Sequence, residues 1–246
     1  MKWNPKKQFL LTMITFAILG AAFKVMVLVE GLTEVRPANA IPMIAGLAFG
    51  PVGALGCACG NLAADLFGTF DWTSALGFAG NFMAAYLPYR MWHLLSGESP
   101  NVHTWRNLAL YAWLSLISAL TVAWLLGFGL ECFFGLWIAS IYRYVFLNNF
   151  GFSLALGLPL FIVLTSDGIR LSMRDAPRAA KRFRWPKDGR AVSFVAVLYT
   201  LCMLFILTGV LTGLHLTNSV SMKILSVLCI LLLLCLCAVS AVEEGV

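Results

Sequence analysis

Long apolar runs, separated by short charged or glycine- and proline-containing stretches, set the fold class of this chain. Several windows reach the roughly 18 to 20 apolar residues that a helix needs to span a bilayer, and residues 222–242 consist mostly of Leu, Cys, Val and Ile. Only 11% of the residues are charged, which is far below the usual share in soluble globular proteins. No series of short alternating segments suggests a barrel. The sequence therefore predicts an all-α polytopic membrane protein.

The positions of the apolar runs and of the charges between them predict eight helices in the cell membrane. The expected helices cover approximately residues 9–29, 37–50, 52–67, 74–95, 108–128, 148–169, 192–214 and 222–242. Lys2, Lys6 and Lys7 precede the first helix, and cytoplasmic loops carry an excess of Lys and Arg, so we expect both termini in the cytoplasm. The first run lacks a small-residue cleavage site and is expected to remain as a helix. Residues 131–147 fit either a short surface helix or the start of a long tilted span.

The distribution of polar residues divides the chain into three expected parts. Residues 1–170 form a six-helix core that carries most of them, and residues 192–246 form an additional hairpin. Residues 171–191 form a basic loop that holds much of the excess behind the net charge of +6. Such a loop is typical of a cytoplasmic segment in contact with anionic lipid, so the charge does not indicate a nucleic-acid partner.

The second expected helix is too short to cross the bilayer. It begins near Pro37, since proline is favoured in the first turn of a helix, and Gly50-Pro51 is a strong break. At this length the helix rises roughly 20 Å, whereas the hydrocarbon core is about 30 Å thick. If its lower end lies at the cytoplasmic surface, its upper end stops within the outer leaflet. We therefore expect a hollow that opens outwards.

Charged residues at matched depth surround this expected hollow. Counting along the first and third helices places Lys24 roughly 22 Å and Asp65 roughly 21 Å above the cytoplasmic ends. Ionisable groups at such depth pair with one another or mark a functional site. The two residues fit a structural pair between helices, a ligand-binding pair, or both. Arg36 lies at the N-terminal end of the second helix, where free amides also favour negative groups.

Further polar and aromatic residues are candidates for substrate binding. An asparagine carries donors and an acceptor and so fits the edge of a heterocycle, although a single membrane asparagine is more simply explained by an interhelical hydrogen bond of about 0.6 kcal/mol. Convergence of several polar residues near one short helix favours a pocket. The full candidate set is Lys24, Glu34, Arg36, Asn39, Asn61, Asp65, Trp72, Asn81, Tyr142, Arg143 and Asn148.

Several of these candidates also fit simpler roles. Trp72 and Tyr142 suit stacking on a flat ligand, but interfacial aromatics are common membrane anchors. Glu34 fits a solvated loop edge as well as a site, and Asn148 fits a cap at the start of the sixth helix.

Small residues recur at helical spacing. Gly46 and Gly50, and then Gly56 and Gly60, form small-xxx-small pairs that let helices approach closely. Internal packing is a sufficient explanation for these glycines. Ala17 and Ala21 form a similar pair in the lower half of the first helix, where a partner protein has room to dock.

Together these features resemble the substrate-binding S component of an energy-coupling factor (ECF) transporter, most closely its QueT-like branch. The resemblance covers about residues 9–170. In that family an Ala-xxx-Ala motif on the first helix, matched here by Ala17 and Ala21, contacts a transmembrane coupling protein. The residues that match the branch are Glu34, Arg36, Pro42, Gly56, Cys57, Asn61 and Leu62, with Ala84, Ala85, Tyr86 and Tyr89 in the fourth helix.

The resemblance implies a transport mechanism. An S component binds a scarce micronutrient from outside, docks on the coupling protein and topples in the membrane, with energy from two ATPase subunits. The implied substrate is a queuosine precursor or another vitamin-like molecule. For a 7-deazaguanine, Glu34 or Asp65 would accept hydrogen bonds from the base, and Trp72 or Tyr142 would stack on it. The chain has no Gly-x-x-x-x-Gly-Lys-Ser/Thr loop for nucleotide phosphates, so ATP-driven transport requires partner chains.

Two other classes of function remain as alternatives. An intramembrane enzyme would need catalytic or metal-binding groups, but His93, His103 and His215 fall in expected loops or near a helix end, and no His-Glu-x-x-His or Gly-x-Ser-x-Gly pattern occurs. A scaffold or regulatory membrane protein would not need polar residues at matched depth. The seven cysteines lie mostly in apolar helices, where they fit packing roles. We expect no catalytic residue, metal site or cofactor.

Overall fold

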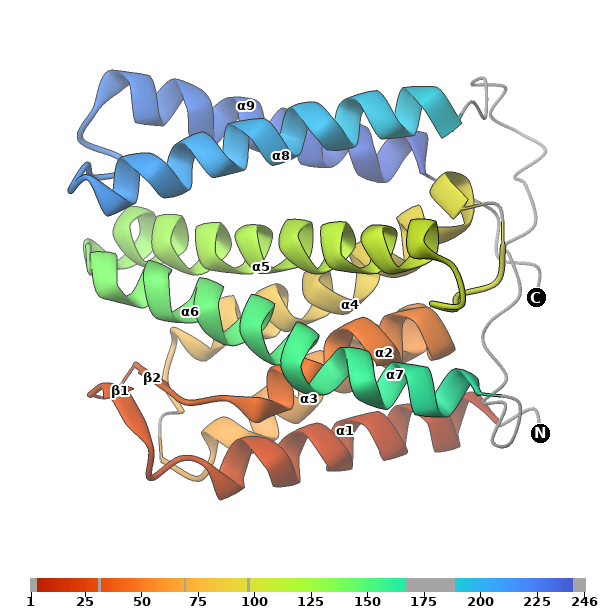
Figure 1. Cartoon of the computed structure of the whole chain (residues 1–246). Coiled ribbons are helices and arrows are strands. Elements are labelled where there is room, and N and C mark those ends of the chain that lie inside the picture. The colour runs from red at the N-terminus through yellow and green to blue at the C-terminus, as the bar shows by residue number, and fades with distance from the viewer. Residues whose placement is uncertain (1–3, 31, 69, 97, 167–188, 241–246) are drawn as a thin grey trace.

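The computed structural model describes residues 4–30, 32–68, 70–96, 98–166 and 189–240, which are almost entirely helical (Figure 1). In chain order the elements are α1 (Pro5–Ala22), β1 (Val27–Val29), β2 (Thr33–Glu34), η1 (Pro37–Ala40), α2 (Ile41–Phe49), α3 (Pro51–Asp65), α4 (Ser74–Ser96), α5 (Trp105–Phe134), α6 (Ala139–Phe152), η2 (Ser153–Gly157), α7 (Leu158–Thr165), α8 (Gly189–Leu211) and α9 (Val220–Val239). The expected basic loop lies outside the described residues, except for residues 189–191 at the start of α8.

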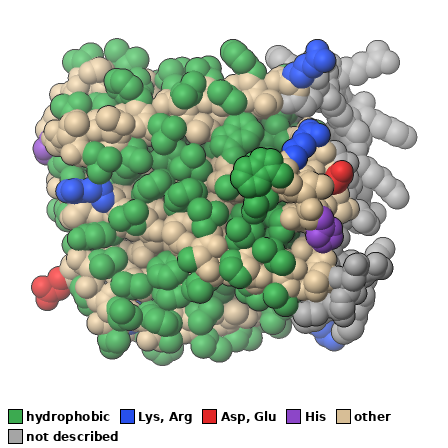
Figure 2. All heavy atoms as spheres, in the orientation of Figure 1, with side chains coloured by type: hydrophobic (Ala, Val, Ile, Leu, Met, Phe, Trp, Pro, Cys, Tyr) green, Lys and Arg blue, Asp and Glu red, His purple; other side chains and the backbone are tan. Residues whose placement is uncertain are grey.

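Four helical segments in the described residues are long and apolar enough to cross a membrane. They are Trp105–Phe134, Ala139–Thr165, Arg190–Leu211 and Val220–Ala238. Figure 2 shows hydrophobic side chains over the middle of the visible face and charged side chains toward its two ends. This distribution fits a bilayer, whose hydrocarbon core disfavours charge. The prediction of an all-α polytopic membrane protein is confirmed.

The predicted short second helix is present as η1 followed by α2. The helical stretch Pro37–Phe49 is shorter than the membrane-spanning segments. It ends at Gly50, whose φ of 60° is a conformation that glycine adopts without steric penalty. Most of α2 is buried, so this helix runs through the interior and brings the polar segment before it into the bundle.

The first helix ends earlier than predicted. It stops at Ala22 rather than near Val29, and the chain then enters an antiparallel hairpin of β1 and β2. Val25, Val27 and Val29 alternate with other residues in the β-branched pattern typical of strands, which the continuous apolar run concealed. Lys24 therefore lies in the turn after α1, and a depth counted along a continuous helix does not apply to it.

Residues 131–134 complete α5, and from Ala139 the chain forms one long tilted span (Figure 1), so the second of the two alternatives holds only for the later part of residues 131–147. The expected sixth helix therefore begins at Ala139 rather than near Asn148. The π-helical segment η2 lies within this span. Pro159, which has no backbone N–H to donate, lies two residues after its end, and such a residue favours a local change in helical hydrogen bonding.

Glycines let α1 and α3 pack closely. A Cβ on either Gly56 or Gly60 would lie 2.7 Å from an atom of α1. The predicted close helix approach at Gly56 and Gly60 is therefore confirmed, and the helix that packs against these glycines is α1. This packing fixes the rotation of α3, which presents Asn61 and Asp65 to the bundle interior, where both are buried.

The C-terminal hairpin of α8 and α9 packs on the α4–α5 side of the bundle, opposite α1 (Figure 1). Polar contacts join it to the core. The hydroxyls of Thr121 on α5 and Tyr199 on α8 lie 2.8 Å apart. Arg90 on α4 donates to the backbone carbonyl of Cys237 near the end of α9, at 3.0 Å. The hairpin is thus anchored to the helices that it covers.

Candidate substrate-binding site

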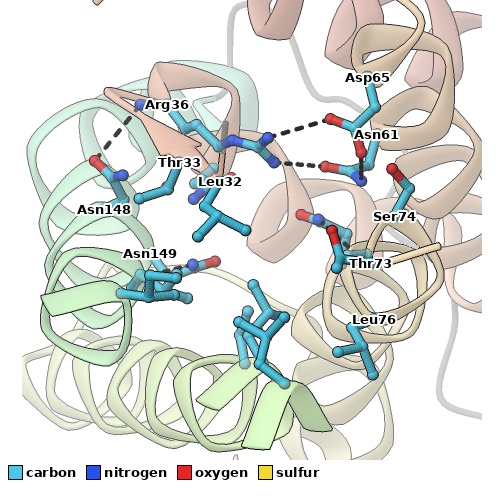
Figure 3. Close-up of a pocket in the computed structure, with 18 residues that line it drawn as sticks. Leu32, Thr33, Arg36, Asn61, Asp65, Thr73, Ser74, Leu76, Asn148 and Asn149 are labelled. Carbon is cyan, nitrogen blue, oxygen red and sulfur yellow. Dashed lines mark hydrogen bonds and ion pairs between the residues drawn. The ribbon is translucent and has the colours of Figure 1, made fainter. Parts of the chain in front are cut away.

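A pocket opens at the end of the bundle that carries the β1–β2 hairpin (Figure 3). Residues from β2, η1, α3, α4, α5 and α6 line it, and it contains about 670 Å³ of empty space, its open mouth included. Arg36 directly precedes η1, and Asn39 lies within it. The shortness of the η1–α2 stretch leaves room here, because no helix continues above η1 to the end of the bundle.

Four charged side chains form one buried network beside this pocket. Glu34 Oε1 lies 2.9 Å from both Lys24 Nζ and Arg36 Nη2. Asp65 Oδ1 lies 3.2 Å from each of the same two nitrogens. Each carboxylate therefore meets both cations, and two positive and two negative formal charges cancel. Such balance is what a buried ionic group requires, since an unpaired one is strongly destabilising.

Two asparagines extend the charge network to α3 and α6. Asn61 Oδ1 accepts a hydrogen bond from Arg36 Nη1 at 2.7 Å, and Asn61 Nδ2 donates to Asp65 Oδ2 at 3.0 Å. On the other side, Asn148 Nδ2 donates to the backbone carbonyl of Glu34 at 2.8 Å. Figure 3 shows Arg36 between these two groups of partners. The segment after α1 is thus tied to both α3 and α6.

Three further asparagines line the pocket outside that network. They are Asn39 on η1, Asn81 on α4 and Asn149 on α6, and each is at most 7% exposed. Asn81 Nδ2 donates to the Gly77 carbonyl at 2.9 Å. Its Oδ1 is buried and has no hydrogen-bond partner among the described residues. Asn39 and Asn149 also line a second, smaller pocket, together with Ser115 and Ser153.

The remaining wall of the pocket is largely apolar. Its side chains come mainly from α5 and α6, with one from α4. They are Leu76, Val122, Leu126, Leu130, Ile141 and Val145. An apolar surface faced by a few convergent polar groups is the usual form of a small-molecule site.

The structure brings most of the predicted polar residues together. Those that line the pocket are Arg36, Asn39, Asn61, Asp65, Asn81 and Asn148. Lys24 and Glu34 stand behind them in the charge network, and the Lys24–Asp65 pair considered from the sequence is present. Glu34 is only 3% exposed, so its alternative placement at a solvated loop edge is wrong.

The other predicted residues lie outside the pocket lining. Trp72 is 84% exposed, whereas Tyr142 is fully buried against the α5 side of the bundle near Gly127. Arg143 is exposed on α6. Ala17 and Ala21 are half-buried on α1.

Four polar lining residues were not predicted: Thr33, Thr73, Ser74 and Asn149. Asn149 directly follows Asn148, which was predicted. Two adjacent asparagines within an apolar span are unusual, so this pair could have indicated both residues as site candidates. Thr33 lies in β2, so its position in the pocket depends on the β1–β2 hairpin. The residues of β1 lie within the range expected for the first helix, so the sequence did not predict this hairpin. In the described part of the chain, no group of three or more His, Cys, Asp or Glu residues is arranged to hold a metal ion.

Comparison with known families gave one match. The family described as QueT transporter matches residues 10–166, which is more than half of the chain. The matched region contains every residue that lines the pocket, and α8 and α9 lie outside it. No curated protein and no solved structure matched the chain.

Proposed function

The chain belongs to the QueT transporter family, and we propose that it is the substrate-binding S component of an ECF-type importer for a vitamin-like small molecule. Its role is in transport across the membrane in which its helices lie. In this proposal the pocket takes up the substrate on the outer side, and both termini lie in the cytoplasm. The observation that carries the proposal is the open pocket above the short η1–α2 stretch, within the family-matched region.

The proposed substrate is a queuosine precursor, that is, a 7-deazaguanine base. A flat base placed between the apolar wall near Leu126 and the polar groups on η1, α3 and α4 would have both stacking area and edge hydrogen bonds available. The geometry favours neither Trp72 nor Tyr142 as the stacking platform, since neither lines the pocket. The carboxylates of Glu34 and Asp65 are already paired with cations.

The proposed partners are a transmembrane coupling protein and two ATPase subunits, in addition to membrane lipid. The proposed docking contact is the Ala17 and Ala21 face of α1. Both alanines are half-buried, and Ile14 and Ile18 beside them are about half exposed or more. Small residues flanked by exposed apolar side chains allow another helix to approach closely. Residues 1–170 are the proposed transport unit, and residues 192–246 are an addition to it.

Reconstituted transport tests this function. The protein is purified together with an ECF coupling protein and its ATPases, inserted in liposomes and supplied with radiolabelled 7-deazaguanine bases. We expect ATP-dependent accumulation that is lost when the phosphate-binding lysine of the ATPases is changed to alanine. Failure to co-purify with any coupling protein, together with no accumulation, would contradict the proposal and favour a scaffold or regulatory role.

A further inference from the structure

The charged and amide side chains at the pocket fall into two sets with different hydrogen-bonding partners, and the hydroxyls of Thr33, Thr73 and Ser74 also line it. The four charged residues bind one another, and Asn61 and Asn148 complete their hydrogen bonds. The second set comprises Asn39, Asn81 and Asn149, which face the pocket without contacting a charged residue. These three amides retain hydrogen-bonding capacity for a ligand.

The Asn81 amide gives the clearest sign of an absent ligand. Its Nδ2 is oriented by the Gly77 carbonyl at 2.9 Å, which leaves Oδ1 as a buried acceptor without a partner in the described residues. Buried polar groups are nearly always hydrogen-bonded, and each exception requires an explanation. Asn81 lines the pocket and is 5% exposed, and a ligand N–H that reached its Oδ1 from the pocket would satisfy this acceptor.

The other two amides have matching capacity. Asn149 donates one Nδ2 hydrogen to the Val145 carbonyl at 2.9 Å, and its second N–H and its carbonyl oxygen remain. The Asn39 side chain makes no hydrogen bond to another described residue. An amide offers two donors and one acceptor group. Amides from η1, α4 and α6 therefore present donors and acceptors from three directions around one space.

From these observations we infer that the pocket recognises the edge of an uncharged heterocyclic base through Asn39, Asn81 and Asn149, and that the charged residues do not contact the ligand as free charges. This inference rests on the proposed function, because it concerns the same pocket and the same class of ligand. The two formal positive charges beside the pocket are balanced by two negative ones. A ligand carboxylate or phosphate would therefore find no unpaired cation, and burying it would be unfavourable.

A matched pair of ligands tests the charge requirement. Isothermal titration on the purified protein compares 7-cyano-7-deazaguanine, which is uncharged, with 7-carboxy-7-deazaguanine, which has the same ring system and a negatively charged, slightly larger substituent. We expect the cyano compound to bind at least about tenfold more tightly, as for an unfavourable burial of charge. Equal or tighter binding of the carboxylate would overturn the inference.

Substitutions separate ligand recognition from a merely structural role. Asn39→Ala, Asn81→Ala and Asn149→Ala should each weaken binding of the cyano compound by about 5- to 150-fold, the range for leaving one ligand group unpaired. Asn81→Ala should lower the melting temperature of the ligand-free protein by less than Asn107→Ala does, since it removes one hydrogen bond to Gly77 together with an unpaired acceptor. Asn107 provides the matched control, because this buried asparagine on α5 donates to Glu98 and Asn101 far from the pocket. Asn107→Ala should lower the melting temperature and keep the affinity.

The outcomes also distinguish this inference from the proposed function. Normal affinity in Asn81→Ala, with a lowered melting temperature, would show a structural asparagine and overturn the inference. If the base binds through these asparagines but no ATP-dependent accumulation occurs, the inference stands and the importer proposal fails. If accumulation occurs and all three variants bind normally, the importer proposal stands and the inference fails.

Discussion

Arg36 Nη1 donates a hydrogen bond of 2.7 Å to Asn61 Oδ1, so the residue that precedes η1 is joined directly to α3. Asn61 is fully buried and also donates to Asp65. It therefore completes the hydrogen bonding of a cation and of an anion at once. The short second helix is held in place at its polar end by this contact as well as by apolar packing.

Replacing Asn61 by leucine should destabilise the protein strongly. The change leaves Arg36 and Asp65 each without one partner in a buried setting, and hydrogen bonds to charged groups contribute about 1.5–3 kcal/mol each. We expect a loss of about 3 kcal/mol in the free energy of unfolding, measured by thermal or denaturant unfolding in detergent. Unchanged stability would mean that Arg36 does not depend on Asn61.

The stability of the protein should depend on the balance of charge in the network of Lys24, Glu34, Arg36 and Asp65 rather than on the number of ion pairs in it. Asp65→Asn leaves Lys24 and Arg36 facing the single carboxylate of Glu34, and removing one partner of a buried pair costs about 3–5 kcal/mol. The double variant Asp65→Asn, Lys24→Met restores balance, so it should recover much of that loss. A double-mutant cycle in unfolding free energy measures the coupling, and simple additivity of the two changes would contradict the network.

The α1–α3 contact should not tolerate a side chain at Gly60. A Cβ at this position would lie 2.7 Å from the Met13 carbonyl oxygen and 2.8 Å from Phe16 Cβ. Gly60→Ala should therefore destabilise by about 1–3 kcal/mol, as expected for overpacking. Gly151→Ala is the matched control, because it lies in α6 with no atom within 4 Å of its Cβ, and it should be neutral or stabilise by about 0.5–1 kcal/mol. Equal effects of the two changes would contradict this packing.

Bulky residues on α1 should block partner capture without affecting the pocket. Ala17→Phe and Ala21→Phe together would fill the face on which the coupling protein is proposed to dock, so the amount of coupling protein that co-purifies should fall several-fold. Binding of the base, measured by titration, should be unchanged. Leu201→Phe on the exposed side of α8 provides the control and should capture the coupling protein normally. Loss of capture in the control, or none in the double variant, would place the docking face elsewhere.

Short sequence motifs predicted the features that depend on a few neighbouring residues. Gly50-Pro51 marked the end of the short helix, and close spacing of glycines marked the contact between α1 and α3. Opposite charges in the first and third apolar segments indicated the pair of Lys24 and Asp65, although the depth counted for Lys24 along a continuous helix was wrong. Each of these features depends on a backbone or electrostatic requirement that few residue types satisfy.

Features set by helix rotation and by tertiary contacts were not predictable in the same way. Tyr142 and Asn148 are both on α6, yet the first turns toward α5 and the second toward the pocket. The orientation of α6 follows from its packing and not from the identity of either residue. The β1–β2 hairpin was not predicted, because Val27 and its neighbours form an apolar run that is compatible with either a helix or a strand.

A structure of the protein bound to 7-cyano-7-deazaguanine tests the central claim most directly. The account predicts density for the base inside the pocket, with its edge within hydrogen-bond distance of Asn39, Asn81 and Asn149 and its face against the side chain of Leu126. The Lys24–Asp65 pair should remain intact in that structure. A base bound outside the pocket, for example against the exposed Trp72, or one that displaces this ion pair to reach the Asp65 carboxylate, would contradict the account.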